Sequence, residues 1–502
     1  MDAIEQLKQD VREGRIGVDR LIDVIEMQQR QLQAALRRIE ELEKKVGGSG
    51  TAKVDEPFSM RAEEKRQARR KNKKLKLSKK GRRGRITTAD KLKLAERTEK
   101  VFPEGVPEQD CHLSHTRPVW RLEKGRAVLV AYEIYRGPKN QYGKIPGVLG
   151  RSEFSMEVMV EIAYFVYVIG LSFDKVCLTL QFLQNLPLGK TQADSLLKQL
   201  SRHWAHEFET LCTLLANSLV VHTDETSWSI NSVWAFLSEK ARVVLFGVHK
   251  DAATLEQFLN PQTFGGLVIS DDAAVYANFS QAQKCWAHLL RKAIKLTLQE
   301  PANQEYRQFT DRLLEIYRAA CRIQRDGRLS AAGRAGKVVG LDEEIVDLCM
   351  PMWAMELPPL EDGPENDYRL LVNEVMRLMV DEQLFTFVTT EPAVQPNGAS
   401  QPVAGTNNEG ERTLRNPAEA RKTGRTNKTL VGARRQTIIV SVLESLRLYL
   451  PKFTLASVMD EIARWWQTGQ SCFTKLLKKM KLKPPTQSIL DKVIPVMPMP
   501  DG

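Results

Sequence analysis

The sequence predicts an α/β protein whose core is a mixed β-sheet covered by helices. Three short runs of β-type composition follow one another closely, which is typical of antiparallel strands joined by short turns. These runs are 217–224, Ser232–Ser238 and Arg242–Val248. Helical patterns dominate before and after this region, over 155–215 and 287–385.

Two further strands complete the predicted sheet. A helical stretch, Ala252–Leu259, leads to an apolar run at 266–271, and Lys284–Trp286 is expected to form a last short strand. Three antiparallel strands, then a helix, then further strands is the order of a ribonuclease H-like fold. We therefore predict a ribonuclease H-like core, followed by a long helical region.

The N-terminal segment, 1–47, is expected to form a coiled-coil helix that dimerises. Its seam positions alternate between spacings of four and three residues, and two of the nine are polar. The seam is Val18, Ile22, Ile25, Gln29, Leu32, Leu36, Ile39, Glu43 and Val46. An amphipathic helix that packs on its own domain is the alternative. Gly47–Gly50 ends the helix.

A basic block carries the whole net charge of +12. Residues 61–85 hold fourteen Lys/Arg and two Glu, which leaves 60 basic and 60 acidic residues in the rest of the chain. We expect the linker 48–100 to be disordered and to contact DNA phosphates in a salt-sensitive way. A solubilising tail is the alternative. The expected contacts include Arg69, Arg70, Lys73 and Lys74.

Two small modules are predicted before the sheet. Residues 101–150 are expected to form a β-rich module with strands at Trp120–Leu122 and Arg126–Arg136. Cys111 and two nearby histidines in this module are weak evidence for a zinc site, because a second pair of ligands is missing. Residues 151–215 are helical and resemble a helix-turn-helix that contacts DNA. Thr191 is the expected cap of its second helix, which ends near Trp204. A plain helical hairpin is the alternative.

The remaining regions follow from composition. The sheet region is 216–290, the helical insertion is 291–388, a further helix with a basic region occupies 389–450, and 451–502 is a C-terminal helical tail. Within the insertion, the helices expected are Tyr306–Arg325, Asp342–Trp353 and Tyr368–Leu384.

The sequence predicts a soluble cytoplasmic protein. Its seven cysteines are dispersed without a Cys-x-x-Cys pair, which fits a reducing compartment. The most apolar helix-like stretch, 156–171, is too short for a membrane span and contains Glu157 and Glu161.

Three acidic sites are the candidates for catalysis. Asp224-Glu225 and Asp271-Asp272 end two buried strands, and Glu409 and Glu411 stand far downstream. Carboxylates at buried strand ends are costly unless they are paired or bind cations. Because neighbouring strand residues face opposite sides of a sheet, only one acid of each pair faces the site easily, and periodicity leaves the choice open.

Rigidly held carboxylates suit magnesium, which prefers hard oxygen ligands. Two such ions, about 3.5–4 Å apart, neutralise charge during phosphodiester cleavage. We therefore expect two Mg²⁺ ions, with Mn²⁺ as a substitute. No P-loop or Ser-His-Asp pattern competes with this hypothesis.

Four motifs make the chain resemble the insertion-sequence-66 family of DDE transposases, over roughly 150–445. They are His222–Trp228, Ser270-Asp271 with Tyr276, Gln283–Arg291, and Asn407–Arg415. The resemblance selects Asp224, Asp271 and Glu411 as catalytic residues and metal ligands. Family members often carry a cysteine cluster before the core, whereas this chain has only Cys111 there.

The resemblance implies metal-dependent cleavage and strand transfer at transposon ends, with double-stranded DNA as partner and a homodimer or larger synaptic complex associated with the nucleoid. A nuclease or resolvase that cleaves without joining, and a DNA-binding regulator with an inactive core, are the alternatives.

Neighbouring residues acquire expected roles. Those predicted to contact DNA are Arg412, Arg415, Arg421, Lys422, Arg425 and Lys428, although a solvated surface is the alternative for the last four. Trp286, His288 and His222 are expected mainly to pack in the core, and either histidine is a candidate to orient DNA or a carboxylate.

Overall fold

The computed structural model describes residues 86–353, 355, 363–485 and 487–494, together with Gln29 and Gln33. The chain separates into two units, Met1–Arg85 and Ile86–Gly502. The predicted coiled coil and the basic block, including Arg69, Arg70, Lys73 and Lys74, lie outside the described residues apart from Gln29 and Gln33, which are helical. These hypotheses therefore remain predictions.

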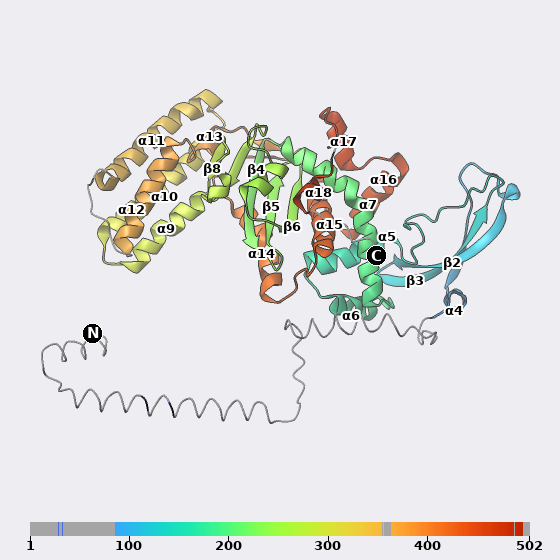
Figure 1. Ribbon diagram of the computed structural model, residues 1–502. Helices are drawn as coiled ribbons and strands as arrows, with labels where there is room; N and C mark the ends of the chain where they lie inside the picture. Colours follow the sequence, from blue (N-terminus) through green and yellow to red (C-terminus); the bar gives the residue numbers. More distant parts are fainter. Residues whose placement is uncertain are drawn as a thin grey trace. The chain divides into compact units, whose positions relative to one another are not determined.

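The second unit is built around a five-stranded mixed sheet, which confirms the predicted α/β class (Figure 1). The strands are β4 (Val220–Ser227), β5 (Ser232–Ser238), β6 (Arg242–Val248), β7 (Leu267–Ser270) and β8 (Ala282–Lys284), in the order β6-β5-β4-β7-β8. β4, β5 and β6 pair antiparallel. β7 and β8 are parallel to their neighbours. Helix α8 (Ala252–Phe258) and the short η3 (Ala274–Tyr276) flank β7 in the sequence.

β5 and β6 have the predicted bounds, but two predicted strands were misplaced. The strand expected at 217–224 instead spans Val220–Ser227, because the preceding helix runs to Ala216 and pairing with β5 continues to Ser227. Asp224 therefore lies inside a strand and not at its end. The last strand ends at Lys284, because Trp286 already begins a helix.

Helix α15 (Leu430–Tyr449) closes one edge of the sheet. Its hydroxyls Thr437, Ser441 and Ser445 accept hydrogen bonds of 2.9–3.0 Å from the backbone N–H groups of Phe246, Val244 and Arg242 in β6. Four residues of helix and two residues of strand both advance by about 6–7 Å, so the two repeats match. The free donors of the edge strand are thereby satisfied.

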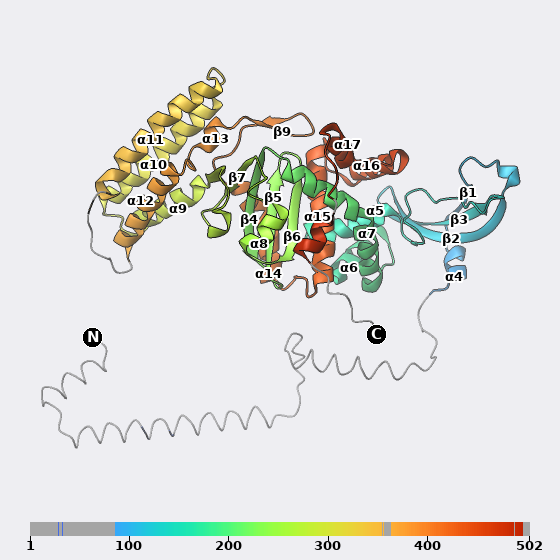
Figure 2. The ribbon, with the colours of Figure 1, turned by 45° about the horizontal axis from the view of Figure 1, so that its top comes forward.

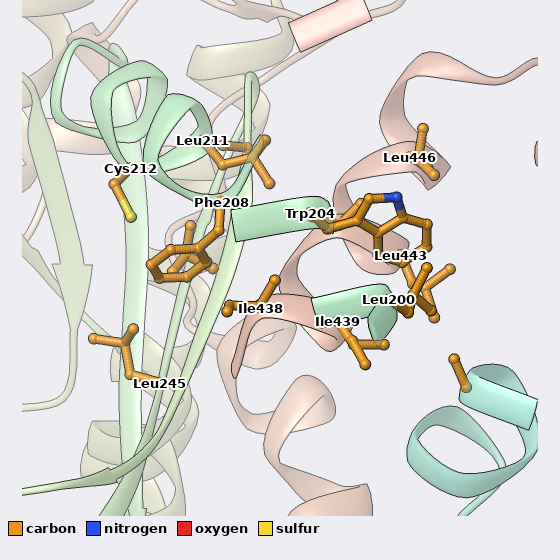
Figure 3. Close-up of a cluster of buried hydrophobic side chains, with 14 of the residues drawn as sticks. Leu200, Trp204, Phe208, Leu211, Cys212, Leu245, Ile438, Ile439, Leu443 and Leu446 are labelled. Carbon is orange, nitrogen blue, oxygen red and sulfur yellow. The ribbon is translucent and has the colours of Figure 1, made fainter. Parts of the chain in front are cut away.

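The long helix α7 (Lys190–Ala216) packs against both α15 and the sheet. Figure 3 shows Trp204 and Phe208 of α7 against Ile438, Ile439 and Leu245. Helix α6 (Phe173–Gln184) precedes it. The predicted cap at Thr191 and the predicted end near Trp204 were wrong. The helix begins after Gly189 and continues for 27 residues, because its apolar face stays buried as far as Leu215.

A second group of helices packs on strands β4 and β7 at the other side of the sheet (Figure 2). They are α9 (Trp286–Gln299), α10 (Gln304–Arg325), α11 (Ala331–Trp353), α12 (Pro364–Val380) and α13 (Thr386–Thr389). α11 begins well before the predicted Asp342. Three glycines lower the helix propensity of that stretch, yet packing of Leu341, Ile345 and Cys349 stabilises the helix.

A three-stranded sheet precedes the helices and has its own small core. It comprises β1 (Arg97–Val101), β2 (His112–Glu123) and β3 (Arg126–Arg136), of which β3 has the predicted bounds. The other elements are α4 (Thr88–Lys93), η1 (Glu108–Asp110), α5 (Met156–Ala163), a π-helix (Tyr164–Val168), β9 (Ala393–Val394), β10 (Ser400–Gln401), α14 (Asn408–Lys422), α16 (Leu455–Thr468), α17 (Cys472–Lys479) and α18 (Ile489–Val493). Among the described residues, no helix combines the length and apolarity that crossing a membrane requires.

Candidate active site

Two of the predicted carboxylates come from adjacent parallel strands. β4 and β7 are paired with His222 opposite Ile269, and Asp271 follows directly after β7. If this register is extended by two residues, Asp271 stands beside Asp224. Paired strands lie about 4.8 Å apart and alternate side chains share a face, so both carboxylates are directed to the same side of the sheet.

Asp224 is the most perturbed of the three predicted catalytic carboxyl groups. Burial raises its pKa to about 7, and the nearby negative charges of Glu225, Asp271 and Glu411 contribute to the same rise. A backbone hydrogen bond to its Oδ1 from the N–H of Glu225, at 2.9 Å, acts in the opposite direction. Asp271 and Glu411 are therefore close enough to raise the pKa of Asp224.

Helix α14 supplies Glu411 and turns Glu409 away from the other two carboxylates. The Glu409 carboxylate accepts a hydrogen bond of 2.6 Å from Arg242 on β6. The Glu411 carboxylate instead faces α9, where Arg291 donates to its Oε1 at 2.5 Å and His288 Nε2 lies 3.7 Å from the same oxygen. Arginine partners on two different elements thus separate two acids that stand only two residues apart.

Gly410 and Asn407 set how closely α14 approaches β4, and the sequence did not reveal their role. A Cβ on Gly410 would lie 2.8 Å from Asn407 Oδ1 and 3.1 Å from Asp224 Cβ. Asn407 is buried and donates through Nδ2 to the carbonyl of Thr223 at 2.7 Å. The sequence feature that could have indicated this close approach is the position of Gly410 between Glu409 and Glu411.

Under the sequence prediction of metal-dependent DNA cleavage, Gly410→Ala is expected to lower the cleavage rate by about tenfold or more, because the added methyl group would push Glu411 away from Asp224. Cleavage rates of the purified variant at saturating Mg²⁺ would measure this effect. Gly336→Ala on α11, where an added Cβ would meet no atom within 4 Å, is the matched control. Equal cleavage by both variants would contradict the close-packing argument.

Glu225 and Asp272, the rejected members of the two acidic pairs, are bound elsewhere. The Glu225 side chain is only 2% exposed; it accepts a hydrogen bond from Tyr276 and pairs with Lys250 at 2.7 Å. Asp272 forms an ion pair with Arg377 of α12. Both carboxylates have cationic partners that hold them, whereas Asp224 forms no ion pair within the described part of the chain.

Among the neighbouring aromatic and histidine residues, some pack in the core and others lie beside the candidate site. Trp286 is a core residue, since it is fully buried, stacks on Tyr317 and donates to the carbonyl of Leu384 at 2.7 Å. Burial lowers the pKa of His222, while the nearby Glu409 opposes that shift. His288 lies beside Glu411 and lines a cavity of about 570 Å³ that also includes Asp271 and Asp272. Asp224 and Glu411 do not line that cavity.

The predicted DNA-binding residues of the α14 region lie mostly on the surface. Arg412, Arg415 and Lys422 are exposed. Arg421 donates to Ser227, and Arg425 donates to the carbonyl of Gly170 at 2.5 Å. Lys428 donates to the Thr426 hydroxyl. Arg412 and Arg425 also line a cavity of about 630 Å³ beside the π-helix.

The carboxylate site fits a divalent cation. Asp224, Asp271 and Glu411 offer hard oxygen donors, and a bound cation would relieve the repulsion of Asp224 by the other two carboxylates. They are not gathered as tightly as a single-ion site requires. Among the described residues, the metal-ligand types found within 4.8 Å of one another are Cys285, His288 and Glu411.

Part of the second unit is similar to a known protein family. Residues 151–359 match the family described as transposase IS66 family. This part of the chain is similar to the transposases of that family. No curated protein matches the chain. The match begins at the predicted boundary and includes Asp224 and Asp271, but it ends before Glu411. The matched family acts in DNA transposition with DNA as partner, and its members generally use divalent metal ions.

Proposed function

We propose that this protein is a DDE transposase that cleaves and joins transposon ends with Asp224, Asp271 and Glu411. The observation that carries the proposal is that Asp271 and Glu411 both act electrostatically on Asp224, although Asp271 follows β7 and Glu411 lies on α14. Acids with perturbed pKa values that gather in this way are typical of catalytic sites.

The strand order supports a ribonuclease H-like core. Antiparallel β4–β6, with parallel β7 and β8 added beside β4, place β4 at the centre of the sheet. In this arrangement Asp224 stands on the central strand, Asp271 follows the adjacent strand, and Glu411 arrives on a helix after the long insertion. We assign that fold to the sheet region on this topology.

In the proposed mechanism the three carboxylates serve two successive phosphoryl transfers. When bound, two divalent ions would hold the attacking and leaving oxygens in line and neutralise their charge. Asp224, Asp271 and Glu411 would supply the oxygen ligands. Water would attack the phosphodiester at the transposon end and release a 3′-hydroxyl. That hydroxyl would then attack a phosphodiester of the target strand at the same carboxylates, join to its 5′-phosphoryl group and displace the target's 3′-hydroxyl.

Residues outside the carboxylate site would position DNA. Arg412 and Arg415, exposed on the helix that carries Glu411, are placed to contact backbone phosphates near the scissile bond. The basic block with Arg69, Arg70, Lys73 and Lys74 would add sequence-independent affinity. Joining two transposon ends requires at least two copies of the chain, and the N-terminal heptads are the proposed dimerisation element.

The decisive experiment compares Asp271→Asn with Asp272→Asn in a cleavage and strand-transfer assay on DNA that carries the ends flanking this reading frame. Asp271→Asn is expected to reduce both steps by on the order of 10³-fold. Asp272→Asn, which loses the pair with Arg377, is expected to reduce them far less.

Other outcomes would point elsewhere. Cleavage of uncut ends, with no joined product even when pre-cut ends are supplied, would favour a nuclease or resolvase. Equal loss in both variants would remove the distinction between the two acids, and undiminished activity in both would exclude Asp271 from the site.

A further inference from the structure

A second set of metal-ligand donors stands at the start of helix α9. The donor atoms of Cys285, His288 and Glu411 lie within 4.8 Å of one another. This set differs in kind from the three carboxylates, because it combines a thiol sulfur, an imidazole nitrogen and one carboxylate oxygen.

The backbone around Cys285 holds these donors in place before any ligand binds. Cys285 is the N-cap of α9, and its N–H donates to the carbonyl of Ser270 at 2.9 Å. Trp286 donates to the carbonyl of Gly405 at 3.0 Å, and the N–H of Asn407 donates to Cys285 Sγ at 3.1 Å. Sheet, helix and the segment before α14 therefore fix the thiol from three directions.

His288 lies three residues beyond Cys285, so the first turn of α9 brings its ring to the same side. The ring nitrogen Nδ1 is buried and has no hydrogen-bond partner among the described residues. The other nitrogen, Nε2, lies 3.7 Å from Glu411 Oε1. A buried imidazole nitrogen without a partner is costly unless a proton acceptor or a metal ion satisfies it.

The chemistry of the donors selects zinc over magnesium. Zinc binds sulfur, imidazole nitrogen and carboxylate oxygen, commonly with three protein ligands and one open position. Magnesium prefers six hard oxygen ligands and does not favour a thiol. We propose that Cys285, His288 and Glu411 form a zinc site that shares Glu411 with the catalytic carboxylates.

The consequence of sharing rests on the proposed function. Zinc bound through Cys285 and His288 would engage Glu411, release the thiol proton to solvent and displace Arg291 from the carboxylate. The catalytic set would then lose the full use of one ligand, so zinc would act as an inhibitor of magnesium-dependent cleavage.

Cobalt binding to the full-length, DNA-free protein tests the site without any catalytic assay. We expect one equivalent of Co²⁺ to give the absorption of a tetrahedral thiolate complex, and zinc to displace it. Cys285→Ser should abolish the sulfur-to-cobalt band, and His288→Gln should weaken zinc binding by about tenfold or more. Cys111→Ser is the matched control, since Cys111 lies outside this donor set, and should leave the band unchanged.

A missing band in the unaltered protein, or a band that persists in Cys285→Ser, would overturn the proposal. Circular dichroism checks that each variant is folded; if Cys285→Ser fails to fold, the zinc affinity of folded His288→Gln decides the matter. Unchanged zinc affinity in that variant would also overturn the site.

A second measurement tests the inhibition. Zinc should slow magnesium-dependent cleavage by the unaltered protein about tenfold, and this ratio should shrink in His288→Gln. An equal ratio in both proteins would overturn the shared-ligand consequence. If the protein cleaves no DNA at all, the proposed function fails while the cobalt result still decides the zinc site.

Discussion

Glu411→Gln is expected to abolish DNA cleavage and joining, by on the order of 10³-fold, whereas Glu409→Gln should retain most activity. The two acids occupy the same first turn of α14, but only Glu411 acts on Asp224. Glu409 instead pairs with Arg242 at 2.6 Å. Single-turnover assays with uncut ends would measure cleavage, and the same assays with pre-cut ends would measure joining, in both variants.

The Glu409 variant also serves as the control for helix damage. Both substitutions remove one negative charge near the N-terminus of α14, so both lose the same favourable interaction with the helix dipole. Equal inactivation would show that the helix, and not the Glu411 carboxylate, carries the effect. Retained activity in Glu411→Gln would remove that residue from the catalytic set.

Asp224→Asn is expected to abolish activity and yet stabilise the metal-free protein. The unfolded carboxyl group ionises near pH 3.8 and the folded one near 7, so the folded state binds more protons between these values. Stability due to this group is therefore greatest at low pH and falls as the pH rises toward 7. At about 1.4 kcal/mol per pKa unit the penalty is on the order of 4 kcal/mol, as an upper limit.

Urea unfolding in the presence of EDTA would measure this stabilisation. Asn cannot ionise, so the variant should gain about 1–2 kcal/mol at pH 8 and much less at pH 5. Saturating Mg²⁺ should stabilise the unaltered protein and not the variant. A variant that is less stable at pH 8 than the unaltered protein would contradict the assigned repulsion among the carboxylates.

Glu225→Gln, at the neighbouring position, should destabilise the protein, whereas Asp224→Asn should stabilise it. Its carboxylate is buried and bound to Tyr276 and Lys250, so the substitution should cost roughly 1–3 kcal/mol of stability in the same urea experiment. Activity should fall much less than in Asp224→Asn, because Glu225 points to the opposite face of β4.

Local patterns in the sequence determined the sheet and its order. The alternation and composition of β5, β6 and β3 predicted their bounds, since strand periodicity is contained within a few residues. The same patterns failed where distant packing competes: α11 includes three glycines, and α7 runs well past Trp204 because its buried face continues against α15.

The sequence alone determined that acids stand at two adjacent strands and on one later helix, because residue type and local periodicity are both readable there. The family resemblance proposed which acid of each pair faces the site, and only the tertiary structure gives the other acid of each pair its partners. Those partners lie far along the chain: Arg242 for Glu409, Arg377 for Asp272, and Lys250 with Tyr276 for Glu225. A buried or half-buried carboxylate is stable where a cation or donor meets it, and no local window of sequence contains those partners.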